Sequence, residues 1–201
     1  MSSNPNNIPC FILAGGQSKR LGANKALIEI GGERLIDIML RKLSAVFSVS
    51  ELVLITIPEH NYPDIKQKKI YDIIPNKSSL GAVYTGLMES NSSHSFFLAC
   101  DMPFINMEFI KFMLTKKPDY DLLIPETDKG LQPLHAIYSK ACISHIKKLM
   151  DENNFKILDF FDKVRLKCIP EKICREFDPE EKMFLNINTI EDLKIAEKMK
   201  L

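Results

Sequence analysis

The stretch FILAGGQSKRLGANKALIEIGG, residues 11–32, begins as an apolar strand and then breaks into glycines and cations. The apolar run Ile8–Ala14 predicts a buried strand. Gly15 and Gly16 let the backbone turn tightly and bring bare N–H groups close to an anion. The loop then adds cations that can neutralise phosphate oxygens: Lys19, Arg20 and Lys25. The stretch predicts a phosphate-binding loop after a first strand, with a solvated surface turn as the alternative.

Strand-like and helix-like patterns alternate along the rest of the chain. The predicted strands are Leu52–Ile57, Lys69–Ile74, Ser95–Cys100, Asp121–Pro125, Leu131–Tyr138 and Val164–Ile169. The predicted helices are Leu35–Phe47, Gly81–Ser90, Phe109–Leu114, Cys142–Met150, Ile157–Phe161 and a closing helix capped by Thr189. This order predicts an α/β fold whose mostly parallel sheet is flanked by helices on both faces. Ligands bind beyond the carboxyl ends of the strands in such sheets.

Length and composition predict one globular domain. The chain has 201 residues, of which 45% are hydrophobic and 26% charged, and its formal net charge is +1. That charge gives no global attraction to nucleic acid or to an anionic membrane. Residues 1–7 read as a disordered polar leader unlike a secretory signal, and no apolar run reaches the ~20 residues of a membrane span. We expect a single domain over residues 8–201 in a cytoplasmic, monomeric protein.

Neither the cysteines nor the histidines predict a metal centre. The five cysteines, an odd number without a CxxC pair, are Cys10, Cys100, Cys142, Cys168 and Cys174. This pattern favours reduced thiols that are buried as small apolar side chains. The four histidines, which lack metal-ligand spacing, are His60, His94, His135 and His145. The glycine loop is neither a Walker loop nor a dinucleotide fingerprint, because Gly-Lys-Ser/Thr and Gly-x-Gly-x-x-Gly are both absent.

A second signal is the stretch FFLACDMPFI, residues 96–105. Asp101 follows a run of uncharged strand residues, so its carboxylate is expected at the same sheet edge as the glycine loop. Pro103 ends strand pairing there. A single carboxylate beside a phosphate loop suits Mg²⁺, which keeps several waters and bridges to substrate phosphates. The alternative is that Asp101 makes a turn or caps a helix that begins near Asn106.

Two further groups of polar residues lie beside predicted elements. Asp72 ends a strand, and Ser78 and Ser79 lead into a helix whose N-terminus favours an anion or a polar base edge. Asn186 and Asn188 alternate with apolar residues, which predicts a last strand with both amides on one face. Capping and turn formation are the alternative roles of both asparagines.

In this order, the motifs resemble the molybdenum cofactor guanylyltransferase family of nucleotidyltransferases, from about Ile8 to Leu193. The segment LAGGQSKRLGANKALIEIGGERLID, residues 13–37, is similar to the family's opening motif, which other nucleotidyltransferases share. Three later segments are typical of the molybdenum group: CDMPF at residues 100–104, QPLHAIY at 132–138 and NINTIEDL at 186–193.

The resemblance implies a Rossmann-like nucleotidyltransferase fold and the transfer of GMP from GTP to the terminal phosphate of molybdopterin or Mo-molybdopterin. Pyrophosphate is the second product. The implied GTP-binding residues are Leu13, Ala14, Gly15, Gly16, Lys25, Asp72 and Asp101. Asp101 would also hold Mg²⁺, and Lys25 and Arg20 would stabilise the leaving pyrophosphate. Asn186 and Asn188 would lie on the pterin side, and other molybdenum-cofactor proteins are expected partners.

The sequence departs from the family at residues 78–82, which read Ser-Ser-Leu-Gly-Ala where the family has Gly-Pro-Leu-x-Gly. Loss of a proline and a shifted glycine change the stiffness of this loop. The departure leaves base selectivity open, so a nucleotidyltransferase that uses CTP or a phosphosugar acceptor is one alternative. A non-catalytic GTP-binding protein of the same fold is the other.

Overall fold

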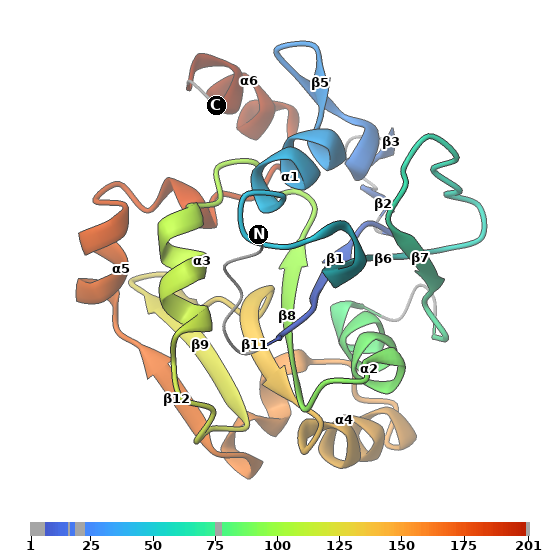
Figure 1. Ribbon diagram of the computed structural model, residues 1–201, viewed down its shortest axis with the longest axis vertical. Helices are drawn as coiled ribbons and strands as arrows, with labels where there is room; N and C mark the ends of the chain where they lie inside the picture. The colour runs from blue at the N-terminus through green and yellow to red at the C-terminus, as the bar shows by residue number, and fades with distance from the viewer. Residues whose placement is uncertain (1–6, 16, 19–22, 75–77, 200–201) are drawn as a thin grey trace.

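A central sheet organises the computed structural model, which describes residues 7–15, 17–18, 23–74 and 78–199 (Figure 1). Its eight strands follow the order β10-β9-β11-β8-β1-β6-β7, with β12 paired to β9. The strands are β1 (Cys10–Leu13), β6 (Leu52–Thr56), β7 (Lys68–Tyr71), β8 (His94–Ala99), β9 (Leu122–Thr127), β10 (Gly130–Leu131), β11 (His135–Ser139) and β12 (Leu166–Ile169). β1 pairs in parallel with both β6 and β8, whereas β11 runs antiparallel between β8 and β9. The predicted mostly parallel sheet is confirmed.

Helices cover both faces of this sheet. They are α1 (Leu35–Leu43), α2 (Ser79–Glu89), α3 (Met107–Leu114), α4 (Cys142–Asp151), α5 (Glu171–Phe177) and α6 (Ile190–Lys198). Successive strand residues face opposite sides, so β1 supplies both layers. Cys10 and Ile12 join a cluster with α1, α3 and α5, and Phe11 joins one with α2 and α4. β1 therefore lies at the centre of the core, and its carboxyl end opens at the middle of one sheet edge.

Helix α2 packs closely against the sheet. A Cβ atom at Gly86 would lie 2.5 Å from the ring of Phe97 and 3.0 Å from Ile55, so only glycine fits this position. The Phe97 ring in turn stacks on Phe11 at 5.3 Å between centroids. This close approach fixes the N-terminus of α2 beside the carboxyl ends of β6 and β7.

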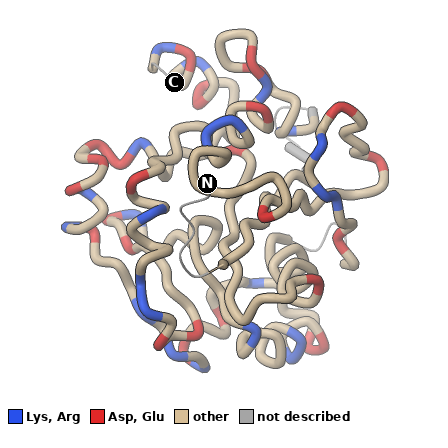
Figure 2. Tube along the Cα trace, in the orientation of Figure 1, with Lys and Arg blue, Asp and Glu red and all other residues tan. Residues whose placement is uncertain are grey.

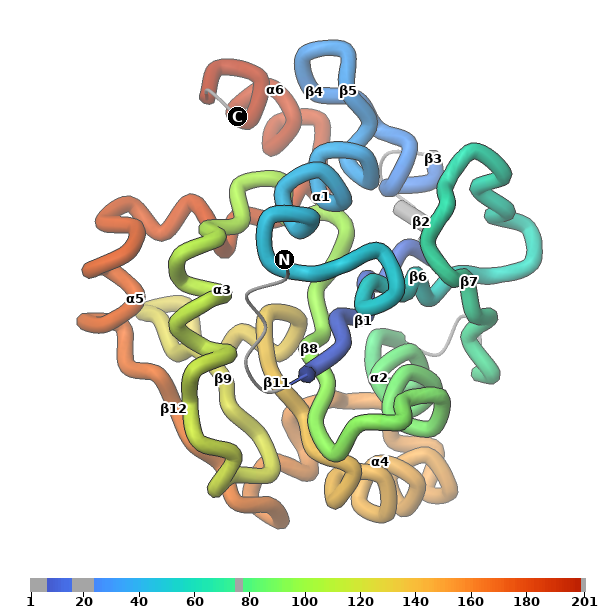
Figure 3. Tube along the Cα trace, in the orientation of Figure 1, coloured from blue at the N-terminus to red at the C-terminus, as the bar shows by residue number. Residues whose placement is uncertain are grey.

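The C-terminal segment returns to a small hairpin near the start of the chain. β4 (Glu29–Ile30) and β5 (Glu33–Arg34) pair antiparallel, and α6 lies beside them (Figure 3). A small core joins the two regions, with Ile30 from the hairpin, Ile187 before α6 and Ala196 within it. Another short antiparallel pair, β2 (Gln17–Ser18) and β3 (Ala23–Asn24), was not predicted either.

Several predicted boundaries are wrong. The expected strand Leu131–Tyr138 is two strands, because Pro133 lies in a turn closed by a hydrogen bond from His135 N to Gln132 O. The expected helix Ile157–Phe161 is the 3₁₀ helix η3 (Ile157–Lys163). Helix α5 was not predicted. No strand contains Asn186 or Asn188, since this segment is an irregular connection between the 3₁₀ helix η4 (Lys182–Phe184) and α6.

The surface carries mixed charge. Figure 2 shows Lys and Arg interspersed with Asp and Glu along the described chain. Of the cysteines, Cys168 is exposed on the outer strand β12, which corrects its predicted burial, and the other four are buried. Within the described ranges, every helix is too short or too polar to cross a bilayer. Residues 1–6, most of the predicted leader, lie outside the described residues.

Candidate active site

A cavity of about 520 Å³, here called the central pocket, opens at the carboxyl ends of β1, β6 and β8. Its position follows from the parallel order of these strands, whose ends meet at one edge of the sheet. Its polar and charged lining includes Lys25, Thr56, Asp72, Ser79 and Asp101, and Leu13 and Gly15 contribute from the first strand and loop.

Lys25 and Asp101 form an ion pair inside the central pocket. Lys25 Nζ lies 2.6 Å from Asp101 Oδ2 and 2.5 Å from Asn188 Oδ1. The side chains of Lys25 and Asp101 are only 17% and 11% exposed. Asp101 Oδ1 is buried and has no hydrogen-bond partner among the described residues. The carboxylate is therefore neutralised by one cation and is not committed to a structural hydrogen bond through its second oxygen.

The backbone of Lys25 is held by a chain of hydrogen bonds. Lys25 begins the 3₁₀ helix η1 (Lys25–Leu27), whose N-cap Asn24 accepts from Ala26 N. Asn24 Nδ2 donates to the Tyr62 hydroxyl, which itself donates to the Ala14 carbonyl at 2.6 Å. Burial raises the pKa of Tyr62 to about 12, so the hydroxyl keeps its proton at neutral pH. Tyr62 thereby links the end of β1 to the base of Lys25.

Asp101 is fixed from two directions. Its neighbour Cys100 donates its backbone N–H to Leu13 O at 3.2 Å, which ties this turn to β1. The Asp101 carbonyl accepts from Ile187 N at 2.9 Å, which ties it to the segment that carries Asn186 and Asn188. The prediction that Asp101 lies at the same sheet edge as the first loop is confirmed. The helix after it is capped by Asn106, whose side chain accepts from Phe109 N.

Asp72 and Ser78 shape the far side of the central pocket. Asp72 Oδ1 accepts from Ile74 N and from the Thr85 hydroxyl, both at 3.0 Å, so this carboxylate joins the end of β7 to α2. Ser78 is the N-cap of α2 and has φ +81°, a backbone conformation that favours glycine. Its hydroxyl compensates by donating to Phe155 O and accepting from Leu80 N. The N-terminus of α2 thus borders the pocket.

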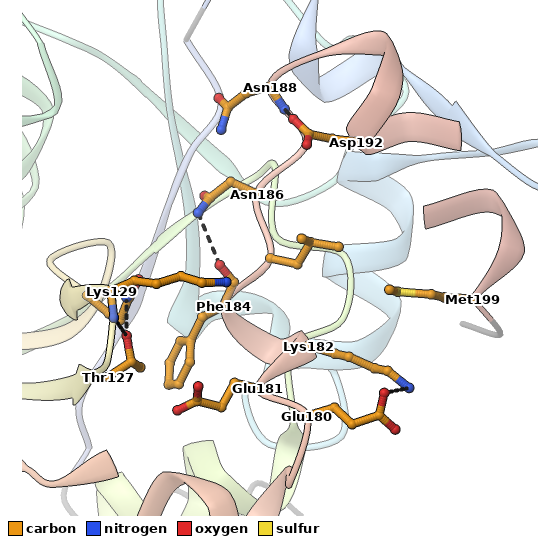
Figure 4. A pocket seen from close by; sticks show the side chains of 12 residues that line it. Thr127, Lys129, Glu180, Glu181, Lys182, Phe184, Asn186, Asn188, Asp192 and Met199 are labelled. Atoms are coloured by element: carbon orange, nitrogen blue, oxygen red, sulfur yellow. Dashed lines mark hydrogen bonds and ion pairs between the residues drawn. The ribbon is translucent and has the colours of Figure 1, made fainter. Parts of the chain in front are cut away.

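A second cavity of about 300 Å³, here called the C-terminal pocket, adjoins this site (Figure 4). Its lining includes Thr127, Lys129, Gln132, Glu181, Asn186 and Asn188. In Figure 4 the amides of Asn186 and Asn188 lie on the same side of their segment. Asn186 Nδ2 donates to Phe184 O at 3.1 Å, and Asn188 N donates to Asp192 Oδ2 at 2.9 Å. Asn188 therefore lines the C-terminal pocket and contacts Lys25 of the central pocket.

An aromatic cluster packs against the wall of the C-terminal pocket through Phe184. His135 is fully buried against Phe96, Phe109 and Phe184, with ring centroids 5.2–5.7 Å apart. Neither ring nitrogen has a hydrogen-bond partner among the described residues. Burial lowers the pKa of His135 to about 3, so the imidazole is neutral at pH 7. Phe184 belongs both to this cluster and to the pocket wall.

The site has the donor set of a metal that is shared with a substrate. Groups of three or more His, Cys, Asp or Glu that could hold an ion are absent from the described ranges. Asp101 offers one carboxylate in the lining of the central pocket. Mg²⁺ commonly binds one or two carboxylates, several waters and substrate phosphates, and it needs no protein cage. Asp101 fits that pattern.

Comparison with known proteins agrees with this architecture. The model of the MobA-like NTP transferase domain matches residues 10–165. The chain belongs to this family. It is 34% identical over 196 residues to a probable molybdenum cofactor guanylyltransferase of Natranaerobius thermophilus, covering 96% of each chain. A probable molybdenum cofactor guanylyltransferase of Pelotomaculum thermopropionicum is 34% identical over 188 residues, covering 94% of this chain and 91% of that protein.

Solved structures show the same fold. Molybdopterin-guanine dinucleotide biosynthesis protein A from Archaeoglobus fulgidus superposes with a TM-score of 0.83 at 26% identity, covering 95% of this chain and 97% of that one. A 4-diphosphocytidyl-2C-methyl-D-erythritol synthase from Anaerococcus prevotii has a TM-score of 0.70 at 16% identity, covering 98% of each chain, and shows the fold alone. The Rossmann-like nucleotidyltransferase fold is therefore confirmed for this member of the MobA-like family.

The structure brings most of the predicted site residues together. Leu13, Gly15, Lys25, Asp72 and Asp101 all line the central pocket. Ala14 lies beneath it, fully buried, with its backbone engaged by Ile55 and Tyr62. Gly16 and Arg20 lie outside the described residues.

Sequence reasoning missed two kinds of residue in this MobA-like site. Thr56 lines the central pocket at the end of a predicted strand, so the strand-end rule could have found it. Tyr62 carried no signal, because it lies in an irregular loop after β6. Thr127 and Glu181 of the C-terminal pocket lie outside every motif that the sequence suggested.

Proposed function

We propose that this protein transfers GMP from GTP to the terminal phosphate of molybdopterin, or of its molybdenum-loaded form, and releases pyrophosphate. Membership of the MobA-like NTP transferase family and the names of the relatives support the proposal. The observation that carries it is the contact of Lys25 with both Asp101 and Asn188. Lys25 thus contacts residues of both pockets. The two pockets are therefore adjacent, as the transfer of a group between two separately bound substrates requires.

The central pocket is the proposed seat of GTP. It is larger than the C-terminal pocket, and apolar walls from Leu13 and Leu134 accompany its charged groups. Such a mixture suits a nucleoside triphosphate, with an apolar surface for the base and cations for the phosphates. Asp72 Oδ1 is bonded to Ile74 and Thr85, which leaves Oδ2 for N–H or O–H donors of the nucleoside.

The C-terminal pocket is the proposed seat of the pterin acceptor. Thr127, Gln132 and Asn186 supply hydroxyl and amide groups that suit the donors and acceptors of a pterin ring. Asn188 lies between this pocket and Lys25, so an acceptor phosphate near Asn188 would approach the triphosphate. Adjacency of the two pockets provides the proximity that the transfer needs.

The proposed reaction needs no general base from the protein. A phosphate monoester has a second pKa of about 6, so the acceptor is mostly dianionic near neutral pH. The difficulty is bringing this anion onto an anionic triphosphate, and charge neutralisation supplies most of the catalysis. Asp101 would hold Mg²⁺, which would neutralise charge at the α-phosphate. Lys25 stabilises the departing pyrophosphate, together with Arg20 from the loop outside the described residues.

A pyrophosphate-release assay with each of the four nucleoside triphosphates, with and without molybdopterin, tests the proposal. Release that requires both GTP and molybdopterin is the expected result. Release with CTP in place of GTP would instead support a cytidylyltransferase, which the serines at 78 and 79 keep as a second candidate. Tight GTP binding without release would identify a non-catalytic nucleotide-binding protein.

The proposal also includes the location of the protein, its oligomeric state and its partners. An enzyme that acts on GTP and a pterin is expected in the cytoplasm as a monomer, with other molybdenum-cofactor proteins as partners. Sedimentation of the purified protein at micromolar concentration tests the monomeric state.

A further inference from the structure

The ammonium group of Lys25 holds the same oxygen that a metal would need. Lys25 Nζ lies 2.6 Å from Asp101 Oδ2, while Asp101 Oδ1 is buried. A cation that comes from the pocket can therefore reach Asp101 only through Oδ2. Lysine and metal compete for one atom.

Repulsion between the two cations makes sharing that oxygen costly. An ammonium and a divalent ion on one carboxylate oxygen would lie a few ångströms apart, where charges near a protein surface repel strongly. The pocket also screens this repulsion little, since the Lys25 and Asp101 side chains are 17% and 11% exposed. Each cation on this oxygen therefore weakens the binding of the other.

We propose that Lys25 occupies the metal position on Asp101 in the absence of nucleotide and exchanges with the metal when a triphosphate arrives. The site then rejects a divalent cation on its own and accepts it together with the nucleotide. The identity of the nucleotide rests on the proposed function, but the competition between Lys25 and the metal does not.

The side chain of Lys25 has the freedom that the exchange requires. Its backbone is anchored through Asn24 and Tyr62, so the ammonium moves on a fixed base. Four methylene groups separate that base from Nζ and give the charge several ångströms of reach. Phosphate oxygens of a nucleotide in the central pocket would supply the new anionic partner.

Asn188 holds the lysine in the first of these two positions. Its Oδ1 accepts from Lys25 Nζ at 2.5 Å, and its backbone N–H is bonded to Asp192, which also caps α6. Because Asn188 also lines the C-terminal pocket, a group bound there that engages this amide weakens its hold on Lys25. Occupation of the C-terminal pocket thus favours release of the lysine.

Binding of Mn²⁺ to the full chain without nucleotide tests the exchange, with free Mn²⁺ measured by electron paramagnetic resonance. The wild type is expected to bind weakly. Lys25→Met, which keeps the stem and removes the charge, is expected to bind at least about tenfold more tightly. Lys66→Met removes one exposed positive charge outside the lining of both pockets and is expected to match the wild type. Lys25→Met/Asp101→Asn is expected to lose the gain.

A Lys25→Met protein that binds Mn²⁺ no more tightly than wild type and Lys66→Met would overturn the proposal. Equal binding by Lys25→Met and Lys25→Met/Asp101→Asn would also overturn it, because the ion would then lie elsewhere. Lys25→Gln repeats the test if the methionine variant does not show the wild-type melting transition. Failure of the transferase proposal gives a different pattern: the Mn²⁺ gain persists while no nucleotide yields pyrophosphate.

Discussion

The central pocket and the C-terminal pocket are built in different ways. The central pocket lies at the ends of β1, β6 and β8, and its charged pair is nearly buried. The C-terminal pocket is formed by the β9–β10 turn, η4 and the irregular segment before α6. Its ion pair, Lys182 with Glu180 at 3.0 Å, is exposed.

The difference predicts which pocket carries out the chemical step and which pocket recognises the acceptor. Side chains at the ends of buried strands are held by the core, so they can be placed against reacting atoms with little loss of order. Side chains on turns adapt to a ligand and mainly set its affinity. Changes in the central pocket should therefore act on kcat, and changes in the C-terminal pocket should act on the KM of the acceptor.

The largest effect is expected from Asp101→Asn. The amide keeps the size of the side chain but removes the charge that would hold the metal, so kcat should fall by about 10³-fold or more. Steady-state guanylyl transfer at saturating Mg²⁺ measures this loss. A variant that keeps activity within a few-fold of wild type would remove Asp101 from the metal role and would erase the contrast between the pockets.

Lys25→Met is expected to lower kcat by about 10²-fold, because the lysine meets charge that develops on the leaving pyrophosphate. Single-turnover transfer measures the chemical step directly. Lys66→Met is the matched control, since it removes one exposed lysine outside both pockets. Equal rates for the two variants would show that Lys25 does not act on the chemical step.

Asn186→Ala is expected to raise the KM of the acceptor by about tenfold, as loss of one hydrogen bond implies. Its side chain lines the C-terminal pocket and donates a hydrogen bond to Phe184 O. The KM of GTP should stay unchanged. A rise in the KM of GTP instead would mean that the two pockets do not divide the substrates as proposed.

The smallest effect concerns His135 below the C-terminal pocket. The folded protein lowers its pKa to about 3, whereas the unfolded chain titrates near 6.5, so acid favours the unfolded state between these values. Lowering the pH from 8 to 6 should reduce the folding equilibrium constant by a factor of about four through this group. Urea unfolding at both pH values measures it, and His135→Leu should show less of the pH-dependent loss. An equal loss in both proteins would contradict the assignment.

The central site was predictable because its signals lie at strand ends. Asp101 follows an uncharged strand, and the parallel order of β1 and β8 brings it to the loop after Leu13. The apolar patterns of the two strands predict this arrangement without any knowledge of side-chain contacts. The ion pair itself was not predicted, since the resemblance implies that Asp101 holds Mg²⁺ and that Lys25 stabilises the leaving pyrophosphate.

The backbone conformation of the C-terminal pocket was not predictable, although the resemblance implied a role for Asn186 and Asn188. Asn186 and Asn188 were expected on a strand because polar and apolar residues alternate there. The structure places Ile187 in a small core with α6 and the β4–β5 hairpin, and among the described residues no strand pairs with this segment. A tertiary contact far away in sequence decided the local conformation, and no short window contains that information.

The hydrogen bond from Ile187 N to the Asp101 carbonyl comes from outside the segment that matches the family model, which ends at residue 165. The C-terminal segment thus helps to position Asp101 in the central pocket. A truncation or fusion at residue 165 would remove this hydrogen bond behind Asp101 while leaving every residue of the opening motif intact.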